Sequence, residues 1–148
     1  MLRRMQGAAR VIDPIWLPCA ALVGVTALVW IKLYADRLSE MRVKRIDPQE
    51  LSNVRAAAGK LDRTQAADNF RNLFEVPVLF YLLCVAIALN GGSTPSLVAA
   101  AWVYVGLRAL HSLIHVTYNR VIHRFLVYVA STLLLFGLWI VFLARIAG

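Results

Sequence analysis

Two groups of polar and ionisable side chains lie next to long apolar segments, where charged side chains are unusual. Asn72 and Glu75 lie about one helical turn apart, and the chain then carries no charge from Val76 to Leu89. If that run crosses a membrane, Glu75 is an ionisable group near bilayer depth, which by default marks a functional site.

The second group forms a stripe on a later helix, because its members are spaced four, three, four and three residues apart. Its members are Tyr104, Arg108, His111, His115 and Tyr118. Such spacing puts side chains on one helix face. Facing Arg108 toward lipid would cost on the order of 3 kcal/mol near mid-depth, so the stripe is expected to face inward.

The stripe is expected to meet the face of the preceding helix that carries Asp68, Asn72 and Glu75. A carboxylate and the Arg108 guanidinium can form bidentate hydrogen bonds there. One interpretation is a buried ion pair that fixes helix register. The other is a polar ligand site, which is favoured because more polar groups are present than one pair needs.

Two more specific kinds of site, a zinc site and a serine nucleophile, are poorly supported by the sequence. His111 and His115 have the helical spacing of a zinc pair, but the glutamate of the H-E-x-x-H motif is missing and no third ligand lies nearby in sequence. Ser112 adjoins His111, but neighbouring positions on a helix point in different directions. We expect neither a metal site nor a serine nucleophile.

Composition places these residues in a membrane protein. The 148-residue chain suits a single domain over residues 1–148, and it is 60% hydrophobic and only 16% charged, with a mean hydropathy of +0.66; soluble domains are about 45–50% apolar and about 25% charged. The net charge of +8 lies between apolar runs and accompanies no nucleic-acid-binding motif, so no nucleic-acid partner is expected. Cys19 and Cys84 fit no disulfide or metal framework and are expected to be buried apolar groups.

Four stretches have the length and composition of transmembrane helices: 15–31, 73–89, 96–116 and 125–144. The first could be a signal peptide, given the arginines before it, but no small-residue cleavage site follows. We expect it to be retained as a span. The fold class is therefore an all-α integral membrane protein, a bundle of four transmembrane helices.

Charge in the connections predicts the orientation. The loop of about residues 32–72 holds nine Lys/Arg against six Asp/Glu, the connection 90–95 is uncharged, and Arg120 and Arg124 mark the third connection. The positive-inside rule puts the first and third connections in the cytoplasm and both termini outside. Arg3, Arg4 and Arg10 argue the other way.

Local signals mark several helix ends. Gly91 suits a helix C-terminus, and Thr94 with Pro95 suits an N-cap and first helical residue, so spans two and three should form a tight hairpin. The segment 47–50 reads as a capping box that starts a short helix ending near Gly59. The second long helix should begin near Arg63 or Ala66 and kink just beyond Glu75, because Pro77 cannot donate to the carbonyl of Leu73.

At these residues the chain resembles bacterial-type members of the MAPEG family, the membrane-associated proteins in eicosanoid and glutathione metabolism. The most specific match is Asn72-Leu73-Phe74-Glu75 followed by Pro77, which looks like the family's Asn-x-x-Glu motif. Val103-Tyr104 leading to Arg108, and the basic third connection, look like the matching part of helices three and four. The resemblance covers most of the chain from about residue 12 onward.

The resemblance implies a homotrimer of four-helix subunits that binds glutathione, as a co-substrate, between subunits. It assigns Asn72 and Glu75 to polar groups of the tripeptide, with Glu75 accepting from its amino group, and adds Arg108, His111 and His115 to the binding site. Arg124, whose match to the family needs a one-residue shift, would stabilise the thiolate, and Arg120 is the alternative. It also implies a multi-pass protein of a bacterial inner membrane, in contact with lipids and a small hydrophobic substrate.

Two departures from the family pattern bear on this site. Family glutathione enzymes usually carry an arginine four residues before the motif asparagine, where this chain has Asp68. Tyrosines that line the site in some members stand here as His111 and His115. A carboxylate at 68 would repel the ligand carboxylate that an arginine would bind.

Three functions fit these observations. The first is a glutathione-dependent transferase or peroxidase acting on hydrophobic electrophiles, in which a cation lowers the pKa of the thiol. The second is a non-catalytic lipid-binding or scaffold protein of the same fold. The third, a small transporter or channel, lacks the paired broken helices typical of that class.

Overall fold

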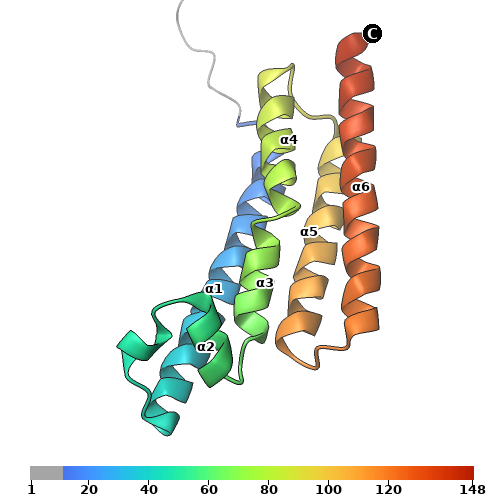
Figure 1. Ribbon diagram of the computed structural model, residues 1–148. Coiled ribbons are helices and arrows are strands. Elements are labelled where there is room, and N and C mark those ends of the chain that lie inside the picture. The colour runs from blue at the N-terminus through green and yellow to red at the C-terminus, as the bar shows by residue number, and fades with distance from the viewer. Residues whose placement is uncertain (1–11) are drawn as a thin grey trace, which may run out of the picture.

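The computed structural model describes residues 12–148, so Arg3, Arg4 and Arg10 lie outside the described residues. The described part consists of helices joined by short connections (Figure 1). The elements are α1 (Trp16–Lys44), the 3₁₀ helix η1 (Pro48–Leu51), α2 (Val54–Lys60), α3 (Gln65–Leu73), α4 (Pro77–Leu89), α5 (Pro95–Val116) and α6 (Val121–Ala147).

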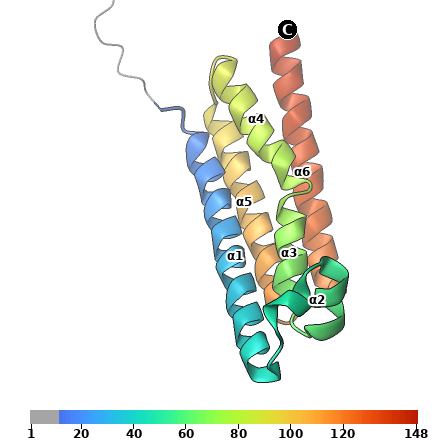
Figure 2. The ribbon, with the colours of Figure 1, turned by 60° about the vertical axis from the view of Figure 1, so that its left-hand side comes forward.

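The long helices run up and down in chain order, with α3 and α4 stacked end to end as one broken rod (Figures 1 and 2). Residues 45–64 and the 117–120 connection lie at one end, which we call the basic end. The 90–94 connection and the C-terminus lie at the other (Figure 1). α5 is central: it packs against α1, α3 and α6, whereas α6 packs mainly on α5 and partly on α4.

The four predicted spans are confirmed as helices long and apolar enough to cross a membrane, with α3 and α4 together forming one of them. α1 continues past Ile31 as a polar helix that ends at Lys44. At the start of this polar part, Lys32 Nζ donates to Asp36 Oδ1 at 2.9 Å and to Oδ2 at 2.7 Å. An α-helix forms hydrogen bonds between its own backbone N–H and C=O groups, and this is needed in a membrane because lipid tails offer no hydrogen-bond partners.

Aromatic and aliphatic side chains fill the centre of the bundle. Phe80 of α4 stacks on Tyr104 of α5 with ring centroids 4.5 Å apart, and Leu22, Cys84 and Leu135 are fully buried beside them. Because lipid tails are as apolar as these side chains, close packing rather than water exclusion holds the helices together here. Cys19 and Cys84 are both free and buried, as their surroundings in the sequence predicted.

At the basic end, the first connection differs in one respect from the prediction. The capping box at Asp47 is present, but it starts only the four-residue η1. A new helix, α2, then begins where the Asn53 side chain accepts from the Ala56 N–H at 2.9 Å, because an asparagine cap supplies a second helix start. Buried Glu40 of α1 ties this connection down by accepting from the backbone N–H groups of Asp62 and Arg63.

At the opposite end, a clasp of polar contacts holds the 90–94 connection to the start of α1. Asp13 accepts from Ser93 Oγ at 2.6 Å, Ser93 N–H at 2.8 Å and Ile15 N–H at 2.9 Å. Burial raises the pKa of Asp13, but these hydrogen bonds and the nearby Arg145 outweigh it and lower that pKa below its ordinary value. Arg145 of α6 completes the clasp by donating to the carbonyl of Gly92 at 2.8 Å.

The predicted hairpin ends are also in place: Gly91 and Gly92 adopt positive φ, and the Thr94 hydroxyl caps α5 at the Leu97 N–H.

The second span is interrupted rather than merely bent. α3 ends at Leu73 and α4 begins at Pro77, so the interruption covers residues 74–76 and includes Glu75 itself. Proline has no N–H for the carbonyl of Leu73 and its ring crowds that carbonyl. The helix therefore ends at Leu73, two residues before Glu75, whereas a kink just beyond Glu75 was predicted.

Candidate functional site

A cavity of about 280 Å³ lies between the α3–α4 break and the first turns of α6, with α5 behind it. It brings together Asn72 and Glu75 from α3 and the break, His111 from α5 and Arg124 from α6. Val121, Phe125 and Tyr128 of α6 complete its wall. Residues far apart in sequence thus form one mixed polar and aromatic pocket near the basic end.

Glu75 is exposed and Asn72 is half-buried. Glu75 lies in the break, so its side chain is not packed against neighbouring turns of a regular helix. Asn72 stands on the last turn of α3, where carbonyl groups are left without intrahelical partners. The break thus presents one carboxylate and one amide to the cavity.

Arg108 supports the break from behind. Its side chain is fully buried, and its Nη2 donates to the backbone carbonyl of Asn72 at 3.3 Å. A cation at the C-terminal end of a helix also complements the helix dipole. The expected bidentate pair with Glu75 is not formed; instead the guanidinium lies 5.4 Å from the centroid of the Tyr128 ring.

Arg124 is held in place by two neighbours. Its Nη1 donates to Asn119 Oδ1 at 2.9 Å and lies 3.0 Å from His115 Nε2. An arginine is always a donor, so His115 Nε2 accepts and this imidazole is neutral. Asn119 can reach Arg124 because it adopts a left-handed conformation, φ 48°, which asparagine tolerates.

His111 has its protonation fixed in a similar way. Its Nδ1 lies 3.0 Å from the backbone carbonyl of Arg124, which can only accept, so Nδ1 carries a proton. The other ring nitrogen, Nε2, has no hydrogen-bond partner among the described residues. In the neutral ring this nitrogen is an acceptor, at a residue that lines the cavity.

Several predicted site residues lie outside the cavity wall. Arg108 and His115 are buried behind it and act on Asn72 and Arg124. Arg120 is exposed at the N-cap of α6 and does not line the cavity. Asp68 was predicted to share a face with Asn72 and Glu75, but it is exposed, faces Arg71 at 3.8 Å and lines a different cavity. Tyr118 lies beyond the end of α5 and is exposed, so the inward stripe stops at His115.

Three residues that build or support the site were not predicted from the sequence: Tyr128, Asn69 and Asn119. Tyr128 contacts both Arg108 and the His111 ring, whose centroid is 5.8 Å from its own. Buried Asn69 accepts from Ser112 Oγ at 3.3 Å, linking α3 to α5, and Asn119 orients Arg124. The one available signal was spacing: Tyr128 lies one helical turn after Arg124.

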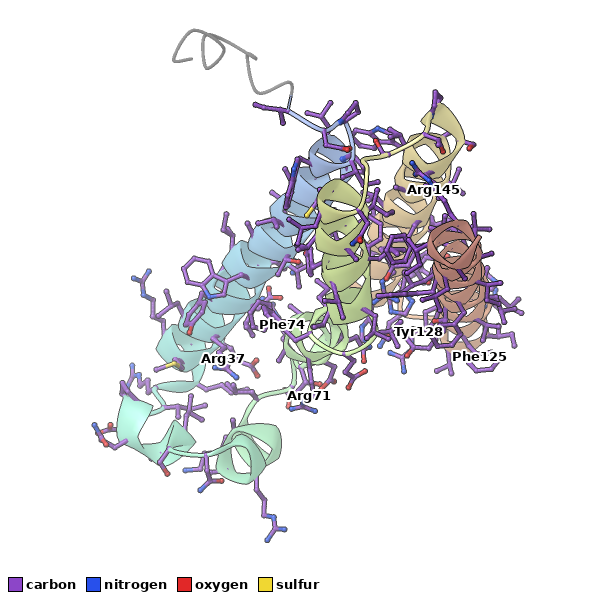
Figure 3. The ribbon with its side chains drawn as sticks, turned by 90° about the horizontal axis from the view of Figure 1, so that it is seen from above. Arg37, Arg71, Phe74, Phe125, Tyr128 and Arg145 are labelled. Carbon is purple, nitrogen blue, oxygen red and sulfur yellow. The ribbon has the colours of Figure 1, made fainter. Side chains whose placement is uncertain are left out.

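The side-chain view separates two regions at this level of the bundle (Figure 3). Tyr128 and Phe125 belong to α6, and Tyr128 lies on the side of α6 that faces the rest of the bundle, whereas Arg37, Arg71 and Phe74 gather between α1 and α3 (Figure 3). The cavity containing Arg124 and the group around Arg37 are therefore on different sides of α3.

Fold and site together define an integral, multi-pass membrane protein with a polar pocket at a broken helix. The MAPEG family model matches residues 15–144, nearly the whole chain, and the chain belongs to the MAPEG family. This places it among membrane proteins of glutathione and eicosanoid metabolism. No curated protein and no solved structure matches the chain.

The residues present fit part of a glutathione molecule, which carries an ammonium, two carboxylates, two amides and a thiol. Glu75 suits the ammonium, the Asn72 amide can bond a carboxylate or amide, and Arg124 supplies a cation. Buried His111 Nε2 has no hydrogen-bond partner among the described residues, and in the neutral ring it is an acceptor that a thiol proton could satisfy. The cavity of one chain contains a single arginine, so a second ligand carboxylate finds no cation within it.

Proposed function

We propose that this protein binds glutathione in the cavity at the α3–α4 break and joins it through its sulfur, with loss of the thiol proton, to small hydrophobic electrophiles. Alternatively, two glutathione molecules reduce a hydroperoxide to an alcohol and water and become a disulfide. The observation that carries the proposal is the meeting of Asn72, Glu75, His111 and Arg124 in one cavity. Bound glutathione would supply the thiol, which is the nucleophile only after it loses its proton.

The chain's own residues would divide the work. Glu75 accepts hydrogen bonds from the ligand ammonium and Asn72 orients its backbone, while Arg124 stabilises negative charge on sulfur. Arg124 is suited to this role because Asn119 and His115 already hold its guanidinium, so little ordering is needed on binding. Exposed Val121 and Phe125 give a hydrophobic partner an apolar surface beside the thiol.

Assembly into a homotrimer is part of the proposal. The cavity's single arginine is assigned to the sulfur, so the carboxylates of the tripeptide have no cation within one chain. A neighbouring copy that closed the cavity would supply the missing cation and exclude water.

The test of binding is glutathione titration of the purified protein, followed by thermal unfolding. A ligand that binds only the native state raises stability by mass action, so millimolar glutathione should raise the unfolding temperature. Glu75→Gln keeps the shape but loses a charge-assisted hydrogen bond, which should weaken binding roughly ten- to hundredfold.

Asp62→Asn is the matched control, since Asp62 is an exposed carboxylate at the same end that does not line the cavity. It should bind glutathione like the native protein. Equal affinity in the native protein and Glu75→Gln would remove Glu75 from the site. Tight binding with no turnover of an aromatic electrophile or a hydroperoxide would favour the non-catalytic alternative.

A further inference from the structure

A second, larger cavity of about 480 Å³ lies between α1, α2 and α3. We call it the interfacial cavity. It shares no lining residue with the candidate site, because Asp68, Arg71 and Phe74 line it while Asn72 and Glu75 line the other. α3 thus separates two cavities with different chemistry.

Apolar side chains make most of the wall of the interfacial cavity. Leu33 of α1 and Leu61, just after α2, are buried in its base. Phe70 of α3 and Phe74 of the break add aromatic surface, with ring centroids 4.9 Å apart, and Phe74 is 59% exposed. A ring this exposed, beside buried leucines, leaves apolar surface available to an occupant.

Three arginines border the same cavity: Arg37, Arg63 and Arg71. Its only acidic lining residue is Asp68, which faces Arg71 at 3.8 Å. Within residues 12–148, no carboxylate lies within ion-pair distance of Arg37 or Arg63. The cavity therefore combines an apolar wall with a net positive border, and Arg37 and Arg71 lie around the same space as Phe74 (Figure 3).

The depth of the cavity matches the boundary between hydrocarbon and headgroups. The uncharged part of α1 ends at Ile31, and Trp30 and Tyr34 form an aromatic pair there with centroids 4.9 Å apart. Tryptophan and tyrosine concentrate at membrane–water interfaces. Tyr34 also lines the cavity, so the cavity lies at the level where acyl chains meet the headgroups.

We propose that the interfacial cavity binds one anionic glycerophospholipid of the adjoining leaflet. Its phosphate lies between Arg37 and Arg71, and one acyl chain runs along Leu33, Phe70 and Phe74. Guanidinium groups bind phosphate with bidentate geometry. A zwitterionic lipid has the same phosphate but brings a cation of its own, which the arginine border disfavours.

The test is native mass spectrometry of the delipidated full-length protein, titrated with dioleoylphosphatidylglycerol or dioleoylphosphatidylcholine. The glycerol lipid should bind in preference to the choline lipid at one saturable site. The variant Arg37→Gln/Arg71→Gln should weaken that site by about fivefold per arginine, about twenty-five-fold in all.

The control Arg42→Gln/Arg55→Gln removes the same charge from exposed positions at the same end, outside the cavity. It should change the affinity little. Equal weakening in the two double variants would mean general attraction to a basic surface and would overturn the proposal. Equal binding of the two lipids would do the same.

Glutathione separates this proposal from the proposed function. The Arg37→Gln/Arg71→Gln protein should still be stabilised by glutathione, since neither arginine lines the candidate site. Loss of glutathione binding with unchanged lipid binding would assign these arginines to the tripeptide and overturn the lipid proposal. If the double variant does not fold, the single variants carry the same comparison.

Discussion

At the scale of single residues, the site depends on side chains that hold other side chains. Arg108 is buried and bonds the Asn72 carbonyl, while His115 and Asn119 hold Arg124. These supporting residues determine which groups reach the cavity. They explain why a buried arginine and a buried histidine belong to a functional cluster without lining its pocket.

The choice between Arg124 and Arg120 is testable at this scale. A cation beside a thiol lowers its pKa by about 1–3, and only Arg124 lines the cavity. We expect Arg124→Gln to raise the pKa of bound glutathione's thiol, with at least about a tenfold loss of thiolate at neutral pH. A pH titration of thiolate ultraviolet absorbance in the complex measures this.

Arg120→Gln serves as the control, since it removes the same charge four residues earlier from an exposed N-cap position. It should leave the thiol pKa near that of the native complex. A raised pKa in Arg120→Gln and none in Arg124→Gln would reverse the assignment.

At the scale of helices, two irregular segments shape the bundle. The break at residues 74–76 puts Glu75 beside the cavity, and Arg108 donates a further hydrogen bond to the Asn72 carbonyl at the start of the break. At the other end, the Asp13 clasp fixes the 90–94 connection against α1. Irregular backbone at membrane depth is tolerated where protein groups satisfy it, and here the backbone N–H groups of Phe74 and Glu75 and the Arg108 guanidinium all donate to the Asn72 carbonyl.

Gly92 provides a test of the clasp. It has φ +81°, and a Cβ added there would lie 2.7 Å from Asp13 Oδ2. Gly92→Ala should therefore lower the free energy of unfolding by about 1–3 kcal/mol, through backbone strain and a displaced Asp13. Equilibrium unfolding in mixed micelles with increasing dodecyl sulfate measures the change.

Gly24→Ala provides the matched comparison and should have the opposite sign. Gly24 lies in α1 with no atom within 4 Å of an added Cβ, so alanine should stabilise the helix by about 0.5–1 kcal/mol. A Gly92→Ala protein as stable as the native one would show that the clasp contributes little.

The sequence predicted the elements better than the contacts between them. Long apolar runs, Thr94-Pro95 and the Asp47 capping box are local signals, and each was confirmed. Glu75 and Arg124 line one cavity, and Asp68 lines another. This arrangement depends on how α3 and α4 are rotated relative to each other at the break. This rotation is set by packing against α5 and α6, which the local sequence does not encode.

At the scale of the whole molecule, charge and apolar surface are distributed unequally. The outer face of α6 exposes Leu126, Leu133 and Ile140, whose side chains are 58%, 65% and 67% exposed. Lipid or a neighbouring copy must cover such a stripe. Meanwhile the basic end carries the 45–64 connection with Arg120 and Arg124, and the opposite connection is uncharged.

This asymmetry makes a prediction about orientation that cysteine labelling can test. Ser52→Cys and Thr117→Cys place exposed thiols at the basic end, and Asn90→Cys places one at the other. The native Cys19 and Cys84 are buried and should react little. By the positive-inside rule, a membrane-impermeant maleimide should label Asn90→Cys in intact cells, and Ser52→Cys and Thr117→Cys only in inverted vesicles.

Each labelling pattern has a distinct physical meaning. The reverse pattern would show that Arg3, Arg4 and Arg10 outweigh the two basic connections in setting orientation. The candidate site would then open on the other side of the membrane, where glutathione is less abundant than in the cytoplasm. Labelling of Ser52→Cys and Thr117→Cys from different sides would contradict the up-and-down bundle itself, because both connections lie at one end (Figure 1). The expected pattern, by contrast, puts the arginine border of the interfacial cavity and the Arg124 pocket on the same side of the membrane, so that a cytoplasmic thiol and a lipid of the inner leaflet reach their two cavities from the same compartment.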